Sequence, residues 1–187
     1  KKIIYNMGRL VPYKGYHHLI QAMALLPEEY ILWVGGDGPL RAELEALVRE
    51  LGLEQRVEIL GYVPSAMKPV YFGACDLFCL SSTMKTEAYA IVQVEAMSLG
   101  RPIVATEIPE SGVSWVNAHG VSGLNVPIED APAMAKAIRE ICENPETWQL
   151  YSRGARQRYY DVFTKVEMIN RLIEIYTDLL AQTDHRK

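Results

Sequence analysis

Two cationic side chains lie close together near the start of the chain, in the segment GRLVPYKG at residues 8–15. Arg9 and Lys14 supply a guanidinium and an ammonium, two groups that bind phosphate well. The glycines at both ends of the segment let the backbone turn sharply and approach a ligand. The segment therefore predicts a phosphate site, although a surface turn with two solvated cations fits the loop alone equally well.

Two carboxylates form a second pair of charged groups, Glu87 and Glu95, with seven residues between them. The backbone N–H groups of residues 88–91 are expected at the start of a helix, where they lack intrahelical acceptors and favour an anion. Because a carboxylate repels phosphate, we expect Glu87 and Glu95 to accept hydrogen bonds from sugar hydroxyls instead. The simpler alternative is that Glu87 caps the helix and Glu95 is solvated on its surface.

A repeated order of strand, loop and helix must position these groups. Short apolar runs predict strands over residues 1–7, 30–34, 57–60, 77–80, 102–105 and 123–126. Helical spacing of apolar residues follows the first two runs, and further helices are expected through Gly73 and through Ser98 after the next two. The sequence thus predicts one α/β domain over residues 1–187, a Rossmann-like parallel sheet of about six strands with helices on both faces. Further C-terminal helices are expected over residues 131–143, 145–160 and 164–181.

Single residues mark the expected helix ends. Pro39 suits the first position of the second helix, and Ser65 is expected to cap the short third helix. Gly52 and Gly100 are expected to end the helices that precede them.

Ligands of such parallel sheets bind at the carboxyl ends of the strands. The loop at residues 8–15 is expected at this edge, because it follows the first strand.

The composition limits the possible functions. The formal net charge of −4 argues against a nucleic-acid binder. No apolar run approaches the roughly 20 residues that span a bilayer and no signal peptide opens the chain, so we expect a cytoplasmic protein. Cys75, Cys79 and Cys142 form neither a metal nor a disulfide pattern and are interpreted as core residues. Since Asp-x-Asp and His-Glu-x-x-His are absent from the sequence, no metal site is predicted.

The order of the motifs resembles that of the retaining group 1 glycosyltransferases of GT-B fold. Along the chain the motifs are GRL with KG, then GGDGP, LGYV, the two glutamates with AM after the second, GRPIVA and GVSGLNVP. Several spaced motifs in one order are specific, whereas any one of them is weak. The segment SGVSWVN at residues 111–117 resembles a sequence variant that is common among transferases that build bacterial surface polysaccharides.

The resemblance implies a role for each matching residue. Arg9 and Lys14 would hold the diphosphate of the donor, and their charge would stabilise the departing phosphate without a metal ion. Glu87 would contact the donor sugar, and these three are the implied catalytic residues. Glu95 would bind the ribose, and the segment at residues 61–64 would lie against the base. The implied donor-binding residues are Gly8, Gly36, Gly38, Tyr62, Val63, Ala88, Tyr89, Ala90, Ile91 and Glu95.

The chain departs from the family pattern in its loops and in its length. The family's Glu-Gly-Phe-Gly is EAYA at residues 87–90, and a Gly-Gly pair is replaced by ESG at residues 110–112, so the donor sugar is not specified. The chain matches only the second of two GT-B domains. We expect an isolated donor-binding domain, inactive without its N-terminal acceptor domain, to which the helix over residues 164–181 would cross back. Membrane proximity would come only through the full-length enzyme.

Two other functions remain open at this point. The same residues would bind a nucleotide in an interaction module without transferase activity. A phosphorylase-like enzyme of GT-B fold would instead hold pyridoxal phosphate covalently. Outside the expected site, the three arginines at 153, 156 and 158 are interpreted as a solvated helix face, and the tryptophans at 33, 115 and 148 as packing residues.

Overall fold

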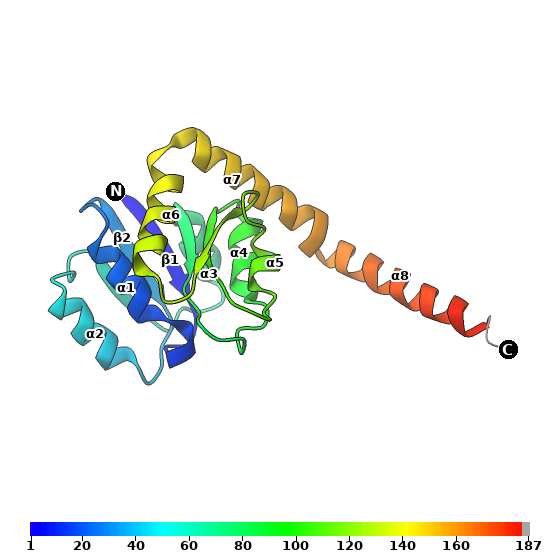
Figure 1. Ribbon diagram of the computed structural model, residues 1–187, viewed down its shortest axis with the longest axis horizontal. Helices are drawn as coiled ribbons and strands as arrows, with labels where there is room; N and C mark the ends of the chain where they lie inside the picture. The colour runs from blue at the N-terminus through cyan, green and yellow to red at the C-terminus, as the bar shows by residue number, and fades with distance from the viewer. Residues whose placement is uncertain (185–187) are drawn as a thin grey trace.

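The computed structural model describes residues 1–184 and shows a sheet covered by helices, with one helix projecting from it (Figure 1). Residues 185–187 of the predicted domain lie outside the described part. The strands are β1 (Lys2–Met7), β2 (Tyr30–Gly35), β3 (Val57–Gly61), β4 (Leu77–Leu80), β5 (Ile103–Glu107) and β6 (Gly123–Pro127). They form one six-stranded sheet in the order β3-β2-β1-β4-β5-β6, and every neighbouring pair is parallel. The predicted Rossmann-like α/β fold is confirmed.

Helices connect the strands and complete the chain. The connecting helices are η1 (Pro12–Lys14), α1 (Tyr16–Ala24), α2 (Arg41–Glu50), α3 (Lys68–Ala74), α4 (Ile91–Ser98) and α5 (Val113–Val116). The C-terminal helices are α6 (Ala131–Glu143), α7 (Pro145–Arg158), the π-helical turn η2 (Tyr159–Phe163) and α8 (Lys165–Asp184). As expected, Gly52 and Gly100 follow α2 and α4 with positive φ angles of 66° and 65°.

Alternation along the strands produces a separate apolar core on each face of the sheet. Ile4 of β1 packs in the cluster that contains residues of α1, α2 and α6. Its neighbour Tyr5 packs in the second cluster, which contains residues of α3, α4 and α5. Successive side chains of a strand point to opposite faces, so one apolar strand supplies both cores. Cys79 lies in the first core and Cys75 in the second, both fully buried, as the sequence predicts.

The strand order reverses direction at the centre of the sheet. The chain passes from β1 outward to β3, and then β4 returns to the other side of β1. Such a reversal opens a crevice at the carboxyl ends of the two central strands. The loop at residues 8–15 follows β1, and the loop at residues 81–90 follows β4, so both border this crevice.

Two expected helix starts are wrong. Helix α2 begins at Arg41 rather than at Pro39, because the N–H of Leu40 donates to the carbonyl of Leu10 at 3.2 Å and so belongs to the loop contact. Helix α3 begins at Lys68 after a turn, and no side chain caps it, so Ser65 does not have its predicted role.

The C-terminal helices extend the fold beyond the sheet. Figure 1 shows α7 running along the domain and α8 projecting away from it. The exposed apolar side chains of α8 are Val166, Met168, Ile169, Leu172, Ile173, Ile175, Tyr176, Leu179 and Leu180. Within residues 1–184 we find no helix with the length and apolar character needed to cross a bilayer.

Arg158 differs from its predicted surroundings, since it packs on Trp115 instead of lying on a solvated helix face. The Arg158 guanidinium lies 5.4 Å from the Trp115 ring centre and donates to the Val116 carbonyl at 2.9 Å. Burial lowers the pKa of Arg158. Arg153 is exposed, so the predicted solvated face applies to Arg153 but not to Arg158. Trp115 is 51% exposed, but its ring packs edge-on against Phe163 with the centroids 5.6 Å apart, so it is a packing residue as predicted. Trp148 packs against the first core and donates to the Asp76 carbonyl at 2.7 Å.

Candidate functional site

The loops that follow the first four strands are joined by hydrogen bonds at one edge of the sheet. The N–H of Gly8 donates to the carbonyl of Gly35 at 2.9 Å, which ties the loop after β1 to the end of β2. The N–H of Gly36 donates to the carbonyl of Gly61 at 2.8 Å, at the end of β3. On the other side, the N–H of Thr83 donates to the carbonyl of Tyr13 at 2.8 Å. The predicted phosphate loop is therefore held between its neighbours.

Three glycines allow these loops to come close. A Cβ atom on Gly36 would lie 1.9 Å from the Gly8 carbonyl oxygen, and Gly36 also has a φ of 138°. A Cβ atom on Gly38 would lie 2.5 Å from the Leu10 oxygen, and one on Gly15 would lie 2.1 Å from the Ser81 oxygen. No side chain fits at these distances. Gly36 and Gly38, predicted to let the backbone approach a ligand, have a demonstrated role in loop packing, and their contact with the donor stays a prediction.

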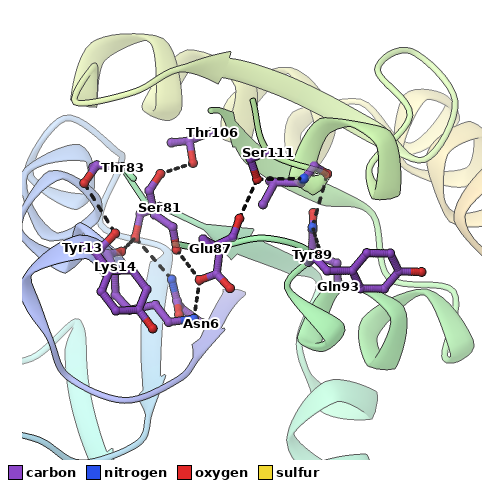
Figure 2. Close-up of polar contacts among 12 residues, drawn as sticks. Asn6, Tyr13, Lys14, Ser81, Thr83, Glu87, Tyr89, Gln93, Thr106 and Ser111 are labelled. Atoms are coloured by element: carbon purple, nitrogen blue, oxygen red, sulfur yellow. Dashed lines mark hydrogen bonds and ion pairs between the residues drawn. The ribbon is translucent and has the colours of Figure 1, made fainter. Parts of the chain in front are cut away.

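Lys14 and Glu87 form a buried ion pair where the β1 and β4 loops meet. Figure 2 shows the Lys14 ammonium pointing at the Glu87 carboxylate, and the contact is made to Oε2. Their side chains are only 11% and 10% exposed. Ser82 donates a second hydrogen bond to the same oxygen at 2.8 Å. The other oxygen, Oε1, makes no hydrogen bond within the described residues, so Glu87 keeps one acceptor for a ligand.

Arg9 behaves differently from Lys14. Its side chain is exposed, and within residues 1–184 it makes no hydrogen bond or ion pair. The two cations predicted to act together are thus in different states. Lys14 is engaged by Glu87, whereas Arg9 is free to bind an anion at the edge of the sheet.

Contacts from neighbouring segments fix the carbonyl groups of the loop that carries Glu87. The Ser111 hydroxyl donates to the Glu87 carbonyl at 2.5 Å, and the Gly112 N–H donates to the Ala88 carbonyl at 2.8 Å. The amide of Gln93, which is fully buried, donates to the Tyr89 carbonyl at 3.4 Å (Figure 2). These contacts fix the carbonyl groups of residues 87–89, and the N–H of Glu87 donates to the Met84 carbonyl at 2.9 Å.

Ala90 adopts a conformation that usually requires glycine. It has φ 56° and ψ 71° directly before α4, and it is 7% exposed. Left-handed backbone costs a residue with a Cβ atom about 1–2 kcal/mol. The chain therefore keeps the backbone shape of a glycine at this position with an alanine. The N–H of Gln93, in the first turn of α4, donates to the Ala90 carbonyl at 2.9 Å, whereas the N–H groups of Ile91 and Val92 have no acceptor among the described residues.

Glu95 pairs with a lysine from another helix. Lys68 Nζ lies 3.1 Å from Glu95 Oε1, and the two side chains are 28% and 34% exposed. The second carboxylate oxygen, Oε2, is buried without a hydrogen-bond partner among the described residues. Neither simple alternative for the two glutamates holds, because the Glu87 carboxylate binds Lys14 and Ser82 instead of capping α4, and Glu95 is an ion-pair partner.

The remaining predicted residues lie around the same edge. Tyr62 follows β3 and is 78% exposed, while its neighbour Val63 is 5% exposed. Tyr89, just before α4, is 36% exposed, and Ile91, the first residue of α4, is 67% exposed. The edge therefore presents accessible aromatic and apolar surface near the two carboxylates.

A buried tyrosine hydroxyl lies next to Gly8, in the loop after β1. The Tyr16 hydroxyl has no hydrogen-bond partner within the described residues, and a Cβ atom on Gly8 would lie 3.2 Å from it. Burial raises the pKa of Tyr16, and the nearby charge of Glu87 raises it further. The Tyr16 hydroxyl therefore keeps its proton at neutral pH and is an unused donor.

Four contacting residues were missed by the sequence reasoning. These are Lys68, Ser82, Gln93 and Ser111. Ser82 had a usable signal, since it follows a predicted strand at the expected binding edge. Lys68 had none, because the pairing depends on the packing of α3 beside α4.

The family model described as "Glycosyl transferases group 1" matches residues 1–158. The chain is 34% identical over 176 residues to O-antigen chain mannosyltransferase C of Escherichia coli, covering 93% of this chain and 46% of that protein. It is 37% identical over 153 residues to the lipopolysaccharide core biosynthesis glycosyltransferase LpsE of Rhizobium meliloti, covering 81% and 43%. The chain thus spans about half the length of these relatives.

Solved structures share the same fold. Anabaena Alr3699/HepE in complex with UDP superimposes with a TM-score of 0.86 and 29% identity, covering 94% of this chain and 48% of that one. The same protein in complex with UDP-glucose gives a TM-score of 0.84 at 28% identity, with the same coverage.

Proposed function

Since this chain belongs to the group 1 glycosyl transferases, we propose that it binds the nucleoside diphosphate sugar donor of a retaining transferase of GT-B fold. The observation that carries the proposal is the buried Lys14–Glu87 pair at the edge where the loops after β1 and β4 meet. A cation and a carboxylate at one edge suit a ligand that combines a diphosphate with sugar hydroxyls. The similar HepE structures, which hold UDP and UDP-glucose, support this ligand class.

Within this proposal the diphosphate lies at Arg9 and Lys14. Arg9 has no competing side-chain partner among the described residues, so its guanidinium is available for the phosphate oxygens. The N–H groups at the start of α4 add further donors for an anion. When the bond between the sugar carbon and the β-phosphate oxygen breaks, negative charge grows on that oxygen. Preorganised donors stabilise this charge, and no metal ion is required in this proposal.

The two glutamates bind the sugars on either side of the diphosphate. Glu87 Oε1 accepts from a hydroxyl of the donor sugar, since Oε2 is already engaged by Lys14 and Ser82. Glu95 binds the ribose. Tyr62 and Val63 lie against the base, and the loop at residues 88–91 encloses the sugar and phosphate. Sugar hydroxyls are well matched to carboxylate acceptors.

The acceptor belongs to the other half of the protein in this proposal. The chain covers about half the length of its relatives, and the exposed apolar residues of α8 are suited to contact a preceding N-terminal domain. The isolated chain then binds the donor without transferring the sugar. In an interaction module without transferase activity, the donor would bind equally well, and addition of the preceding domain would produce no transfer.

A ligand panel tests the proposal directly. Thermal unfolding of the purified chain is measured with UDP, GDP, UDP-glucose and the unphosphorylated nucleosides. A ligand at 100 times its dissociation constant stabilises by about 2.7 kcal/mol, so binding is visible as a raised melting temperature. We expect stabilisation by at least one diphosphate and little by its nucleoside. The absence of any diphosphate effect would contradict the proposal, and an absorbance band of bound pyridoxal phosphate would favour the phosphorylase-like alternative.

A further inference from the structure

Glu95 is held in place from outside its own helix. Lys68 is the first residue of α3, and its Nζ lies 3.1 Å from Oε1 of Glu95 in α4. The two residues are 27 positions apart in the sequence, so only the packing of α3 beside α4 brings them together. About a third of each side chain is exposed, which places the pair at the boundary between solvent and core.

The Glu95 carboxylate is only partly used by the protein. Lys68 occupies Oε1, whereas Oε2 is buried and has no hydrogen-bond partner within residues 1–184. A carboxylate has room for about four hydrogen bonds, so most of this capacity remains. A single ionic contact is enough to restrict the rotation of a glutamate side chain without filling its acceptors.

Lys68 and Glu95 also line one cavity. It has a volume of about 350 Å³ and lies between α3 and α4. Its remaining walls are formed by Ser65, Pro69, Phe72, Ser98 and Leu99. The pair thus places one cation and one anion against a space bounded by hydroxyl and apolar groups.

Resting on the proposed function, in which Glu95 binds ribose, we propose that Lys68 is the positioning residue for Glu95. The ammonium fixes the carboxylate toward the cavity and compensates its negative charge. The compensation matters because the donor carries a diphosphate, which an uncompensated carboxylate repels. Lys68 then acts on ribose recognition through Glu95 and has no separate contact of its own with the nucleotide.

Binding of ribose and dideoxyribose ligands tests the inference. Calorimetry on the full chain measures UDP and GDP, each beside its 2′,3′-dideoxy analogue, and the preference is the ratio of the two dissociation constants. Lys68→Met keeps the apolar stem and removes the charge, and Lys68→Arg restores the charge. Lys2→Met is the matched control, since Lys2 is also 28% exposed and paired to a glutamate, Glu29, at 3.7 Å, at the opposite end of β1 from the site.

The expected results follow from the indirect role of Lys68. Lys68→Met lowers the ribose preference by roughly 5-fold, Lys68→Arg restores most of it, and Lys2→Met leaves it unchanged. Adding Lys68→Met to Glu95→Gln produces no further loss, because a residue that acts only through Glu95 has nothing left to position.

The proposed function and this inference fail in different ways. If neither diphosphate binds the wild-type chain, or if Glu95→Gln leaves the ribose preference unchanged, the proposed function is wrong. If Glu95→Gln abolishes the preference but Lys68→Met does not reduce it, the proposed function stands and the positioning role is wrong. An additional loss in the double variant would assign Lys68 a direct ligand contact and overturn the inference.

Discussion

Each glutamate of the pair is matched by a lysine from a distant part of the chain, but the two ion pairs differ in burial. Lys14 and Glu87 are about 90% buried, and Ser82 donates to the same carboxylate oxygen. Lys68 and Glu95 are about one-third exposed, and Glu95 keeps a buried oxygen that has no hydrogen-bond partner in the described part of the chain. The first pair joins the loops after β1 and β4, while the second joins two helices. The difference indicates that Glu87 supports the fold more than Glu95 does, and the ligand roles of both glutamates stay part of the proposed function.

The largest expected effect separates the two glutamates by stability. Glu87→Gln leaves the buried ammonium of Lys14 without its counter-charge, which should lower the free energy of unfolding by about 3–5 kcal/mol. Glu95→Gln affects a partly exposed pair and should cost less than about 1 kcal/mol. Urea denaturation of both variants measures the difference. Equal losses would break the comparison and show that burial does not distinguish the pairs.

The next largest effect is on diphosphate affinity and concerns Arg9, a cation that belongs to neither of these two ion pairs. Arg9→Ala should weaken UDP or GDP binding by about 1.5–3 kcal/mol, because a charge-assisted hydrogen bond is lost. Stability should not change, since Arg9 has no partner in the described residues. Arg153→Ala is the matched control, an exposed arginine on α7. Calorimetry at low and high salt measures both variants, and wild-type diphosphate affinity in Arg9→Ala would remove Arg9 from the site.

A smaller effect on stability is expected at Ala90, which lies between Glu87 and Glu95 in the sequence. Ala90→Gly should remove the left-handed strain of about 1–2 kcal/mol but add the chain entropy of glycine, about 0.5–1 kcal/mol. The net result should be a stabilisation of about 1 kcal/mol in urea denaturation. Ala88→Gly is the control, because Ala88 has no positive φ angle and should gain nothing. Destabilisation by Ala90→Gly would show that the alanine side chain packs better than its backbone strain suggests.

The smallest expected effect is no change at all. Within residues 1–184 no group of three or more histidine, cysteine or acidic side chains is placed to hold a metal ion. Both glutamates are already paired to lysines. Diphosphate affinity should therefore be the same with and without a chelator, measured by calorimetry. Loss of binding on chelation would show that a glutamate exchanges its lysine for a metal ion.

The sequence predicts the elements of this fold better than their exact ends. All six strands follow from apolar runs, because buried parallel strands have a simple composition. Pro39 predicts the wrong start for α2, because the next residue, Leu40, hydrogen-bonds to Leu10 in another loop. Ser65 predicts the wrong start for α3, because a turn separates it from Lys68, where the helix begins. Helix α5 has only four residues and is too short to show a helical period.

The sequence predicts where the charged residues of the site lie, but not which ion pairs they form. Strand ends indicate where Arg9, Lys14 and Glu87 lie, because parallel strands deliver their following loops to one edge. Sequence alone does not indicate that Lys14 is engaged while Arg9 is free. That depends on the approach of two loops 73 residues apart, which the glycine at position 15 permits.

The glycines of the loops also affect how genetic data on this protein must be interpreted. If the proposed transfer is the readout of a saturation screen, almost every substitution at Gly36 or Gly38 would score as inactive, because any Cβ atom strikes the backbone of the neighbouring loop. Inactivity at these positions reports a lost fold rather than a lost ligand contact. Positions such as Arg9 and Tyr62, which are exposed, lack this ambiguity. Alleles at these exposed positions would therefore separate defects in donor use from defects in protein abundance.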